Sequence, residues 1–176
     1  MTFKELAEKR ESCRSYDSTR EVEQEKIDTI LSVARLSPSA CNGQPYHVSV
    51  ISGDSAVAVG KACMGMGMNP FMKDVPVMLV ISERDYNKTA AFGAKIKHND
   101  YRSIDIGILA ANITLAAADL DLGTCIVGWF DNKKICEVLG EEVTVRLVIA
   151  LGYPRDEKPP REKKRKSAEE LFSEIN

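Results

Sequence analysis

The chain has 176 residues, 44% of them hydrophobic and 28% charged, and a formal net charge of -2. This length fits one domain with a sizeable core and is too short for two ordinary ones, so the sequence predicts a single domain over residues 1–176. The balanced charge indicates no nucleic-acid partner, and no uncharged apolar run reaches the roughly 18 residues that a membrane span requires. Because the N-terminus leads into a polar helix pattern rather than an apolar signal core, we expect a cytoplasmic protein.

The first part of the chain predicts two helices and a turn. Thr2 and Glu5 have the spacing of a capping box, so a first helix begins there and ends near Glu11. Apolar residues recur at helical spacing over 27–34, and a proline ends this second helix. The turn that follows, 37–46, reads SPSACNGQPY. Its small polar residues are typical of a turn that holds a ligand.

Four strands are predicted in the rest of the chain, over 47–51, 76–81, 124–129 and 143–152. A helix over 55–66 follows the first of them. The second strand is a continuous apolar run, which fits a strand covered on both faces better than an exposed edge. It therefore belongs in the middle of a sheet.

Two more helices lie between these strands. Residues 103–121 are rich in Ala, Leu and Ile with hardly a polar face, so we expect a helix that is buried all round, at the domain centre and in a subunit interface. Gly123 stands where the C-cap of this helix would be. A shorter helix begins near Asn132, with Asp131 as its N-cap and Gly140 at its end.

Residues 155–176 read as a basic surface arm and a short helix. The stretch 155–166 holds seven Lys or Arg against three acids. Ser167 and Glu170 then repeat the capping-box spacing before three apolar residues, so a final helix that docks on the domain is predicted.

Two basic clusters could meet on one anion. Arg10 and Arg14 are four apart at a predicted helix end, so they can lie on one face with Ser12 between them, and each guanidinium can bond two phosphate oxygens. With the basic run 163–166 they favour a phosphate-bearing cofactor. Other interpretations stay open: the arginines as solvated helix-end cations, and the arm as a solvated tail or a nucleic-acid segment, although the arm has no interleaved aromatic residue.

The common nucleotide and catalytic motifs are absent. Gly53 and Gly60 are too far apart for a P-loop, and the segment 65–67 lacks the third glycine of a dinucleotide fingerprint. No G-x-S-x-G elbow and no Cys/His pair justifies a nucleophile and a base. We therefore predict no catalytic residue in the chain itself, and a cofactor that carries the chemistry.

Disulfides and metals are not indicated either. The five cysteines are Cys13, Cys41, Cys63, Cys125 and Cys136. They are odd in number and scattered, so most are expected to be buried and free. His47 and His98 have no metal-ligand spacing to each other or to a cysteine, and no metal site is predicted.

Six patches occur in the order and at the intervals seen in nitroreductases. They are Arg10-x-Ser12-x-Arg14-x-Tyr16, residues 37–45, Asp105-x-Gly107, Leu122-Gly123-Thr124-Cys125, Leu151-Gly152-Tyr153-Pro154 and Lys163-x-Arg165. On these patches the chain resembles the FMN-dependent nitroreductase family over nearly its whole length.

The resemblance implies an α+β fold, with a central, mostly antiparallel sheet flanked by helices, in a homodimer with one FMN at each of two interface sites. The residues that it assigns to FMN are Arg10, Ser12, Arg14, Lys163 and Arg165 for the phosphate, Pro38, Ser39, Ala40 and Asn42 from the neighbouring chain, and the backbone of Ile126, Val127 and Gly128 for the ring edge.

The chemistry that the resemblance implies is a two-step exchange. NADH or NADPH gives hydride to FMN and leaves, and a nitroaromatic, a quinone or a similar small acceptor then takes the electrons. A specialised flavin enzyme, for reductive dehalogenation or flavin breakdown, and a flavin-binding protein without general turnover are the alternatives. Tyr86, Phe92, His98 and Tyr101 are candidates for the pocket mouth, with exposed-loop positions as the other interpretation.

Overall fold

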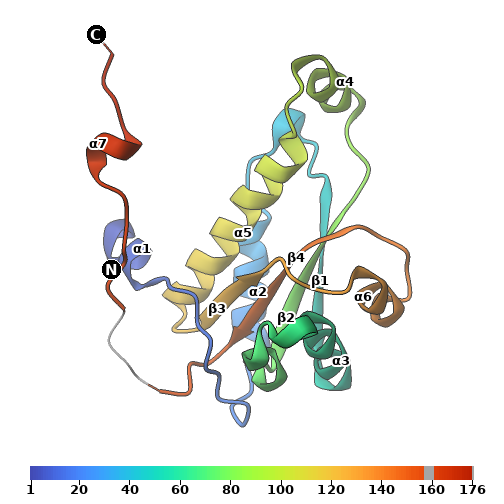
Figure 1. Cartoon of the computed structure of the whole chain (residues 1–176), viewed down its shortest axis with the longest axis vertical. Helices are drawn as coiled ribbons and strands as arrows, with labels where there is room; N and C mark the ends of the chain where they lie inside the picture. The colour runs from blue at the N-terminus through green and yellow to red at the C-terminus, as the bar shows by residue number, and fades with distance from the viewer. Residues whose placement is uncertain (157–160, 176) are drawn as a thin grey trace.

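A four-stranded antiparallel sheet forms the centre of the molecule (Figure 1). The structure is a computed structural model that describes residues 1–156 and 161–175. The strands are β1 (Tyr46–Ser52), β2 (Val77–Glu83), β3 (Gly123–Val127) and β4 (Val145–Gly152), and they lie side by side in the order β1-β2-β4-β3. The apolar strand β2 lies in the interior of the sheet, as predicted.

Helices flank the sheet on both faces. Those packed on it are α2 (Gln24–Ala34) and α5 (Tyr101–Asp119) on one face and α3 (Gly53–Cys63) and α6 (Asn132–Leu139) on the other. The remaining helices are α1 (Phe3–Lys9), α4 (Lys88–Lys97) and α7 (Ala168–Leu171), with short 3-10 turns η1 (Ala40–Asn42), η2 (Gly65–Gly67) and η3 (Pro70–Asp74). The predicted capping boxes of α1 and α7 are both present, and Asp131 accepts from the first turn of α6. The α+β fold predicted from the sequence is confirmed.

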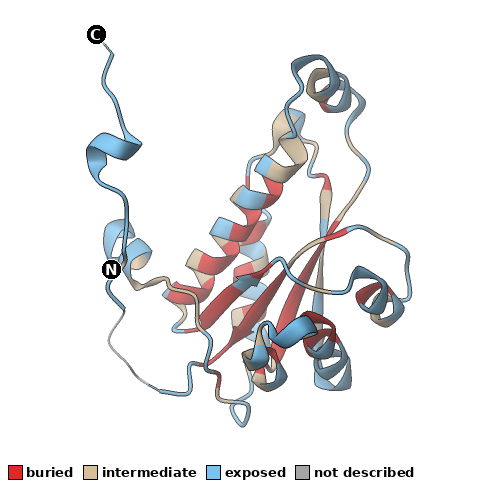
Figure 2. Cartoon of the chain, in the orientation of Figure 1, coloured by how far each residue is buried: buried red, intermediate tan, exposed pale blue. Residues whose placement is uncertain are grey.

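The sheet separates two apolar layers. Along β2, Leu79 and Ile81 pack with α2 and α5, whereas Met78 and Val80 pack with the layer that contains α3 and α6. Figure 2 shows the resulting buried strands between the two layers of helices. Period-two alternation along a strand covered on both faces accounts for this division.

The long helix α5 differs from its prediction in two ways. It is not buried all round: Ile104, which is 49% exposed, Gly107 and Ala111 form an exposed stripe that is visible along one side of the helix in Figure 2. None of these three residues is polar, so a single chain leaves apolar surface in water. Gly123 is not the C-cap either, because Leu120 caps the helix, Asp121 takes the left-handed conformation (φ 62°), and Gly123 begins β3.

The C-terminal helix also differs from its prediction. It forms, but it does not dock on this chain: Phe172 is 74% and Ile175 94% exposed, and α7 stands beyond α1, away from the sheet (Figure 1). The basic arm predicted over 155–166 is exposed apart from a half-buried Lys163, and its residues 157–160 lie outside the described part of the chain. No helix among the described residues is long and apolar enough to cross a membrane.

A close approach at Gly152 gives a stability prediction. A Cβ on Gly152 would lie 2.8 Å from Cγ and Cδ of Pro76 and 3.1 Å from Cδ1 of Tyr16, with no flexible neighbour to move away. We expect Gly152→Ala to lower the free energy of unfolding by about 1–3 kcal/mol through overpacking. Chemical denaturation measures it, with Gly128→Ala as the control because nothing lies within 4 Å of a Cβ there. Equal stability of the two variants would contradict the packing argument.

Candidate functional site

The segment after α1 is extended, not helical. The helix ends at Lys9, Ser12 forms a parallel bridge to Thr124 of β3, and the Cys13 N–H donates to the Thr124 carbonyl at 2.8 Å. The prediction that Arg10 and Arg14 share a helix face is therefore wrong. Since side chains two apart share one face of an extended segment, the two arginines and Ser12 still lie on the same side.

A basic hollow of about 300 Å³ opens beside this segment. Its lining residues are Arg10, Glu11, Ser12, Arg14, Arg161, Glu162, Lys163, Lys164 and Arg165. Six of them are basic and two are acidic, so the hollow is strongly cationic. All five residues predicted to hold a phosphate line it, which brings the N-terminal and C-terminal basic clusters together. We call this set the basic hollow.

The cations of the basic hollow have unequal partners. Arg161 pairs with Glu11 at 3.3 Å and donates to the Ser12 carbonyl at 2.8 Å. Arg14 has only a 3.5 Å contact to that same carbonyl, and within the described residues neither Arg10 nor Arg14 has a carboxylate partner. Two guanidinium groups are thus available for an anion.

Lys163 joins the arm to α1. Its ammonium donates to the Ala7 carbonyl at 2.8 Å and to the Glu8 carbonyl, in the last turn of the helix. Partial burial, followed by the charges of Arg10 and Arg165, lowers the pKa of Lys163 below its usual value. An anion in the basic hollow would offset this crowding of positive charge, so the residues present fit a phosphate group.

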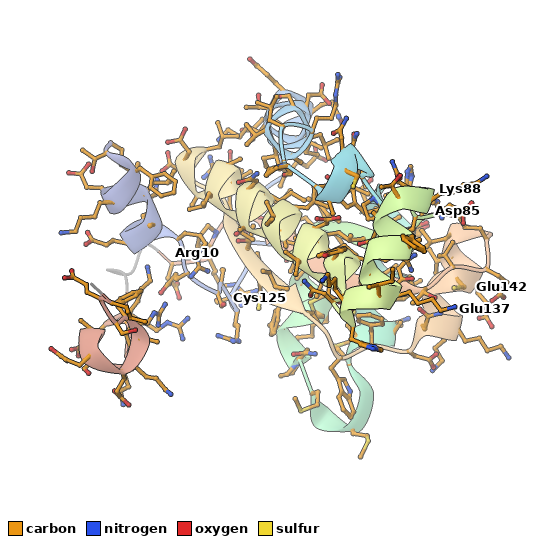
Figure 3. The ribbon with its side chains drawn as sticks, turned by 90° about the horizontal axis from the view of Figure 1, so that it is seen from above. Arg10, Asp85, Lys88, Cys125, Glu137 and Glu142 are labelled. Atoms are coloured by element: carbon orange, nitrogen blue, oxygen red, sulfur yellow. The ribbon has the colours of Figure 1, made fainter. Side chains whose placement is uncertain are left out.

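The predicted turn lies at the other end of α5. Residues 37–44 run along α5 from its middle toward its N-terminus: Asn112 donates to the Ser37 hydroxyl at 2.8 Å, and the Ala40 N–H donates to Oδ1 of Asp105 at 3.0 Å. Pro38 and Asn42 are exposed, and Ser39 is half-buried. Figure 3 shows Arg10 beside α1 at one end of the molecule and Asp85 and Lys88 near α4 at the other.

Within one chain the two groups of predicted residues do not meet. Asp105 contacts the turn, and Ala118 lines a cleft of about 860 Å³ together with Arg10 and Arg14. Asp105 and Ala118 are 13 positions apart on α5, which is about 20 Å at the rise of an α-helix. The basic hollow and the turn therefore lie at opposite ends of one long helix.

The predicted ring-edge residues lie on the edge strand β3. Ile126 is exposed, Val127 is buried, and Gly128 follows the strand and is exposed. Pairing with Ser12 covers the start of β3 only, and no further strand lies beside its later residues in the described part of the chain. Trp129 comes next and donates from its indole to the Gly65 carbonyl at 3.2 Å. An open strand edge thus continues from the basic hollow.

The four candidates for a pocket mouth lie on α4 or in the chain directly before and after it. Phe92 is exposed on that helix, and His98 ends it in the left-handed conformation (φ 49°), so both fit exposed positions. Tyr101 is half-buried at the start of α5. Burial raises the pKa of Tyr86 to about 12, with a further contribution from the charge of Asp105.

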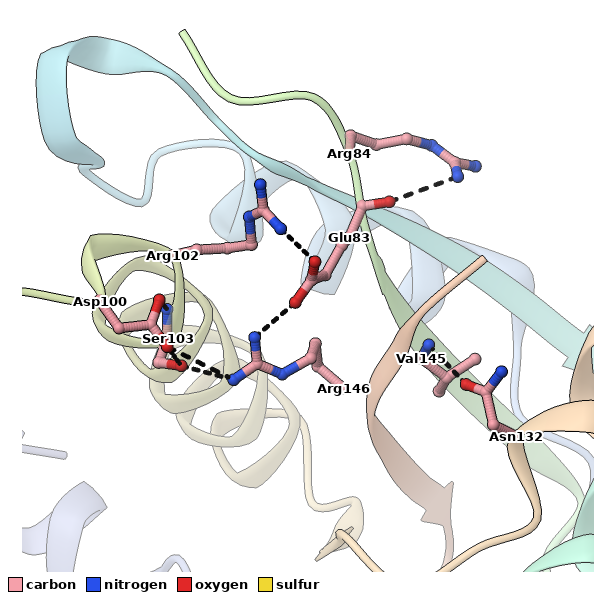
Figure 4. A network of polar contacts seen from close by, with 8 residues as sticks. All are labelled: Glu83, Arg84, Asp100, Arg102, Ser103, Asn132, Val145 and Arg146. Atoms are coloured by element: carbon pink, nitrogen blue, oxygen red, sulfur yellow. Dashed lines mark hydrogen bonds and ion pairs between the residues drawn. The ribbon is translucent and has the colours of Figure 1, made fainter. Parts of the chain in front are cut away.

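A polar network that the sequence did not predict fixes the start of α5 (Figure 4). The Glu83 carboxylate at the end of β2 pairs with Arg102 of α5 and with Arg146 of β4, the latter at 2.5 Å. Arg146 also reaches Asp100, the N-cap of α5, at 3.9 Å. This network joins charged residues that are far apart in the sequence, and such residues carry no periodic signal that could have revealed it.

Comparisons with known proteins agree with this geometry. A family model described as the Nitroreductase family matches residues 7–153. The oxygen-insensitive NADPH nitroreductase of Helicobacter pylori strain 26695 is 23% identical over 181 residues, with 85% of this chain and 86% of that protein covered. The chain belongs to the nitroreductase family.

Solved structures share the fold. A nitroreductase family protein from Streptococcus pneumoniae TIGR4 superposes with a TM-score of 0.81 at 22% identity, covering 99% of this chain and 100% of that one. An FMN-dependent nitroreductase from Clostridium difficile R20291 gives a TM-score of 0.71 at 28% identity, covering 94% and 92%. The sheet and its helices are thus the nitroreductase fold.

Proposed function

We propose that the protein is an FMN-dependent oxidoreductase that takes hydride from NADH or NADPH and reduces a nitroaromatic, a quinone or a similar small acceptor. The observation that carries the proposal is the basic hollow, in which two arginines adjoin a strand edge; among the described residues the arginines have no carboxylate partner and the edge has no further strand beside it. Family membership and the FMN-dependent and NADPH-dependent relatives support the same function.

The residues take three roles in this proposal. Arg10, Ser12, Arg14, Lys163 and Arg165 hold the phosphate, the backbone at Ile126, Val127 and Gly128 faces the ring edge, and Pro38, Ser39, Ala40 and Asn42 of a second copy close the site. When bound, FMN supplies the hydride acceptance and donation. The chain's part is to orient the cofactor and to offer backbone donors near the ring, so no side chain is assigned as a catalytic acid, base or nucleophile.

A homodimer is part of the proposal. Asp105, which contacts the turn, and Ala118, which lines the cleft beside Arg10 and Arg14, are about 20 Å apart along α5, so a site that uses both regions needs a second copy. The exposed stripe on α5 and the apolar residues Leu171, Phe172 and Ile175 offer surface for it. We further propose that residues 1–176 act as one FMN-binding domain, with 155–176 as its basic arm and short helix. The cytoplasmic location stays a prediction, checked by cell fractionation.

An anaerobic absorbance titration tests the proposed activity. The purified protein, reconstituted with FMN, is expected to show oxidised-flavin absorbance that bleaches on addition of NADH or NADPH and returns when a quinone is added. Absorbance that persists with both donors would contradict reductase activity and favour flavin binding without turnover. Bleaching followed by slow turnover on quinones and nitroaromatics would favour a specialised flavin enzyme. Failure to take up FMN would overturn the proposal as a whole.

A further inference from the structure

The turn proposed to reach the neighbouring flavin has a strained backbone. Cys41, Asn42 and Gln44 adopt φ angles of 51°, 52° and 45°, in the left-handed region that residues other than glycine seldom occupy. Such a conformation is unfavourable for a residue with a side chain and persists only where its surroundings hold it. The conformation of this turn therefore depends on its anchors.

Internal hydrogen bonds supply some of the anchoring. The Gln44 N–H donates to the Ser39 hydroxyl at 3.0 Å, and the Gln44 side chain donates to the Asn42 carbonyl at 3.1 Å. These bonds close the turn on itself. They do not fix where the turn lies on the domain.

Two side chains of α5 hold the first half of the turn on the domain, and Nδ2 of Asn87 adds a longer 3.5 Å hydrogen bond to the Cys41 carbonyl. Oδ1 of Asp105 accepts from the Ala40 N–H at 3.0 Å, and Nδ2 of Asn112 donates to the Ser37 hydroxyl at 2.8 Å. They are seven residues apart, which places them two turns apart on one face of the helix. Asp105 lies on α5 next to Ile104 and close to Gly107, two residues of the exposed stripe. The turn is therefore tied to the helix that carries the stripe.

Asp105 occupies a costly environment for a carboxyl group. It is 3% exposed, and its Oδ2 is buried without a hydrogen-bond partner in the described residues. The Tyr86 hydroxyl is also buried and unpaired, and the charge of Asp105 contributes to the raised pKa of Tyr86. A buried polar atom without a partner destabilises a fold, so the carboxyl is not explained by stability.

We propose that Asp105 is a positioning residue that holds the 37–44 turn in its flavin-binding conformation and ties that turn to the dimer helix α5. The buried carboxyl lowers the stability of the fold, but it keeps the Ala40 N–H and the strained residues after it in a fixed position. This inference rests on the proposed function, because the turn is there assigned to the FMN of a second copy. It adds a residue that does not itself contact the cofactor.

The test compares Asp105→Ala, which removes the acceptor, with Asp105→Asn, which keeps an oxygen able to accept from Ala40. Thr114→Val is the matched control, since Thr114 is equally buried on α5 but its hydroxyl donates to the Ala111 carbonyl of its own helix and to no other described residue. Hydrogen exchange of peptides covering 37–46 is measured first on protein without FMN. Fluorescence titration with FMN and the thermal midpoint follow.

We expect Asp105→Ala to exchange the turn amides at least about tenfold faster and to bind FMN about 10- to 100-fold more weakly, the size expected for a lost hydrogen bond to a charged acceptor. The thermal midpoint changes little, because an unpaired buried group is removed with the bond. In Asp105→Asn the turn exchange rate and the FMN affinity stay within about threefold of the wild-type values, and in Thr114→Val both are unchanged.

The inference would be overturned if Asp105→Ala kept the wild-type exchange rate and FMN affinity. It would also be overturned if Asp105→Asn lost as much turn protection and FMN affinity as Asp105→Ala. Should Asp105→Ala fail to fold, Ala40→Pro removes the donor instead, and Ser39 before it has the extended conformation (φ -145°, ψ 156°) that a following proline requires. Unchanged turn exchange in that variant would also overturn it. Because the exchange measurement needs no flavin, a fast-exchanging Asp105→Ala in a protein that never binds FMN would keep the anchor and reject the proposed function alone.

Discussion

Arg14→Ala is expected to weaken FMN binding about 10- to 100-fold while it changes the turnover of the flavin-saturated enzyme by less than about threefold. The guanidinium lines the basic hollow and has no carboxylate partner among the described residues, so its donors are available for a phosphate. The phosphate is far from the reacting ring, and its anchors therefore affect cofactor retention more than chemistry. Fluorescence titration of the apoprotein with FMN and assays at saturating FMN measure the two effects separately.

Lys166→Ala is the matched control for this prediction. It removes one positive charge from the same arm, but Lys166 does not line the basic hollow. Only a small, salt-sensitive loss of affinity is expected for it. Equal FMN affinity in Arg14→Ala and wild type would show that the arginine is a solvated cation. If Arg14→Ala and Lys166→Ala lost the same FMN affinity, Arg14 would contribute only through its positive charge and not through a specific contact.

The local parts of the fold could be predicted from the sequence. The capping box of Thr2 and Glu5, the N-cap Asp131 and the left-handed Gly140 all depend on neighbours within one turn, and all three are present. The apolar run of β2 likewise identified an interior strand, because both faces of such a strand must be covered. Short-range hydrogen bonding and simple periodicity were sufficient here.

Features that depend on distant segments could not be predicted. Gly123 was expected to cap α5, but the left-handed Asp121 turns the chain two residues earlier, and Gly123 is needed where Cys13 packs against β3. A Cβ at Gly123 would lie 2.8 Å from the Cys13 Cβ. Glycine is required at this position because of Cys13, which is 110 residues away in the sequence, so the residues around Gly123 do not reveal the requirement.

The candidate site also combines features that the local sequence determines with features that distant segments determine. The residue types of the basic hollow were evident from the sequence, but the reason that Arg10 and Arg14 share a face was not, because the bridge from Ser12 to Thr124 makes the segment extended. The strained conformation of Cys41 and Asn42 was also invisible, since neither is glycine. Its anchor, Asp105, belonged to the Asp105-x-Gly107 patch of the family resemblance, but no local pattern showed that its carboxyl group would hold the 37–44 turn.

Ala111→Arg is expected to convert a yellow dimer into a colourless monomer. Ala111 is exposed on the α5 stripe, so an arginine there fits the fold of a single chain. In an interface built on this stripe the same arginine would be a buried, unpaired charge, which costs several kcal/mol and weakens dimerisation by at least about 100-fold. Because the turn and the basic hollow lie at opposite ends of α5, each monomer would keep only half of a flavin site and release FMN. Sedimentation velocity followed at the visible flavin absorbance measures mass and cofactor together.

Ala58→Arg separates this effect from that of a surface arginine in general. Ala58 is exposed on α3, across the sheet from α5, and its variant is expected to remain dimeric and yellow. The shared site also requires that wild-type protein diluted to the monomer loses flavin at the same rate as it dissociates. A monomeric Ala111→Arg that stays yellow would refute a site shared between two chains, and a dimeric, yellow Ala111→Arg would remove the α5 stripe from the interface. Loss of FMN from a variant that remains dimeric would instead assign the stripe to the cofactor pocket itself.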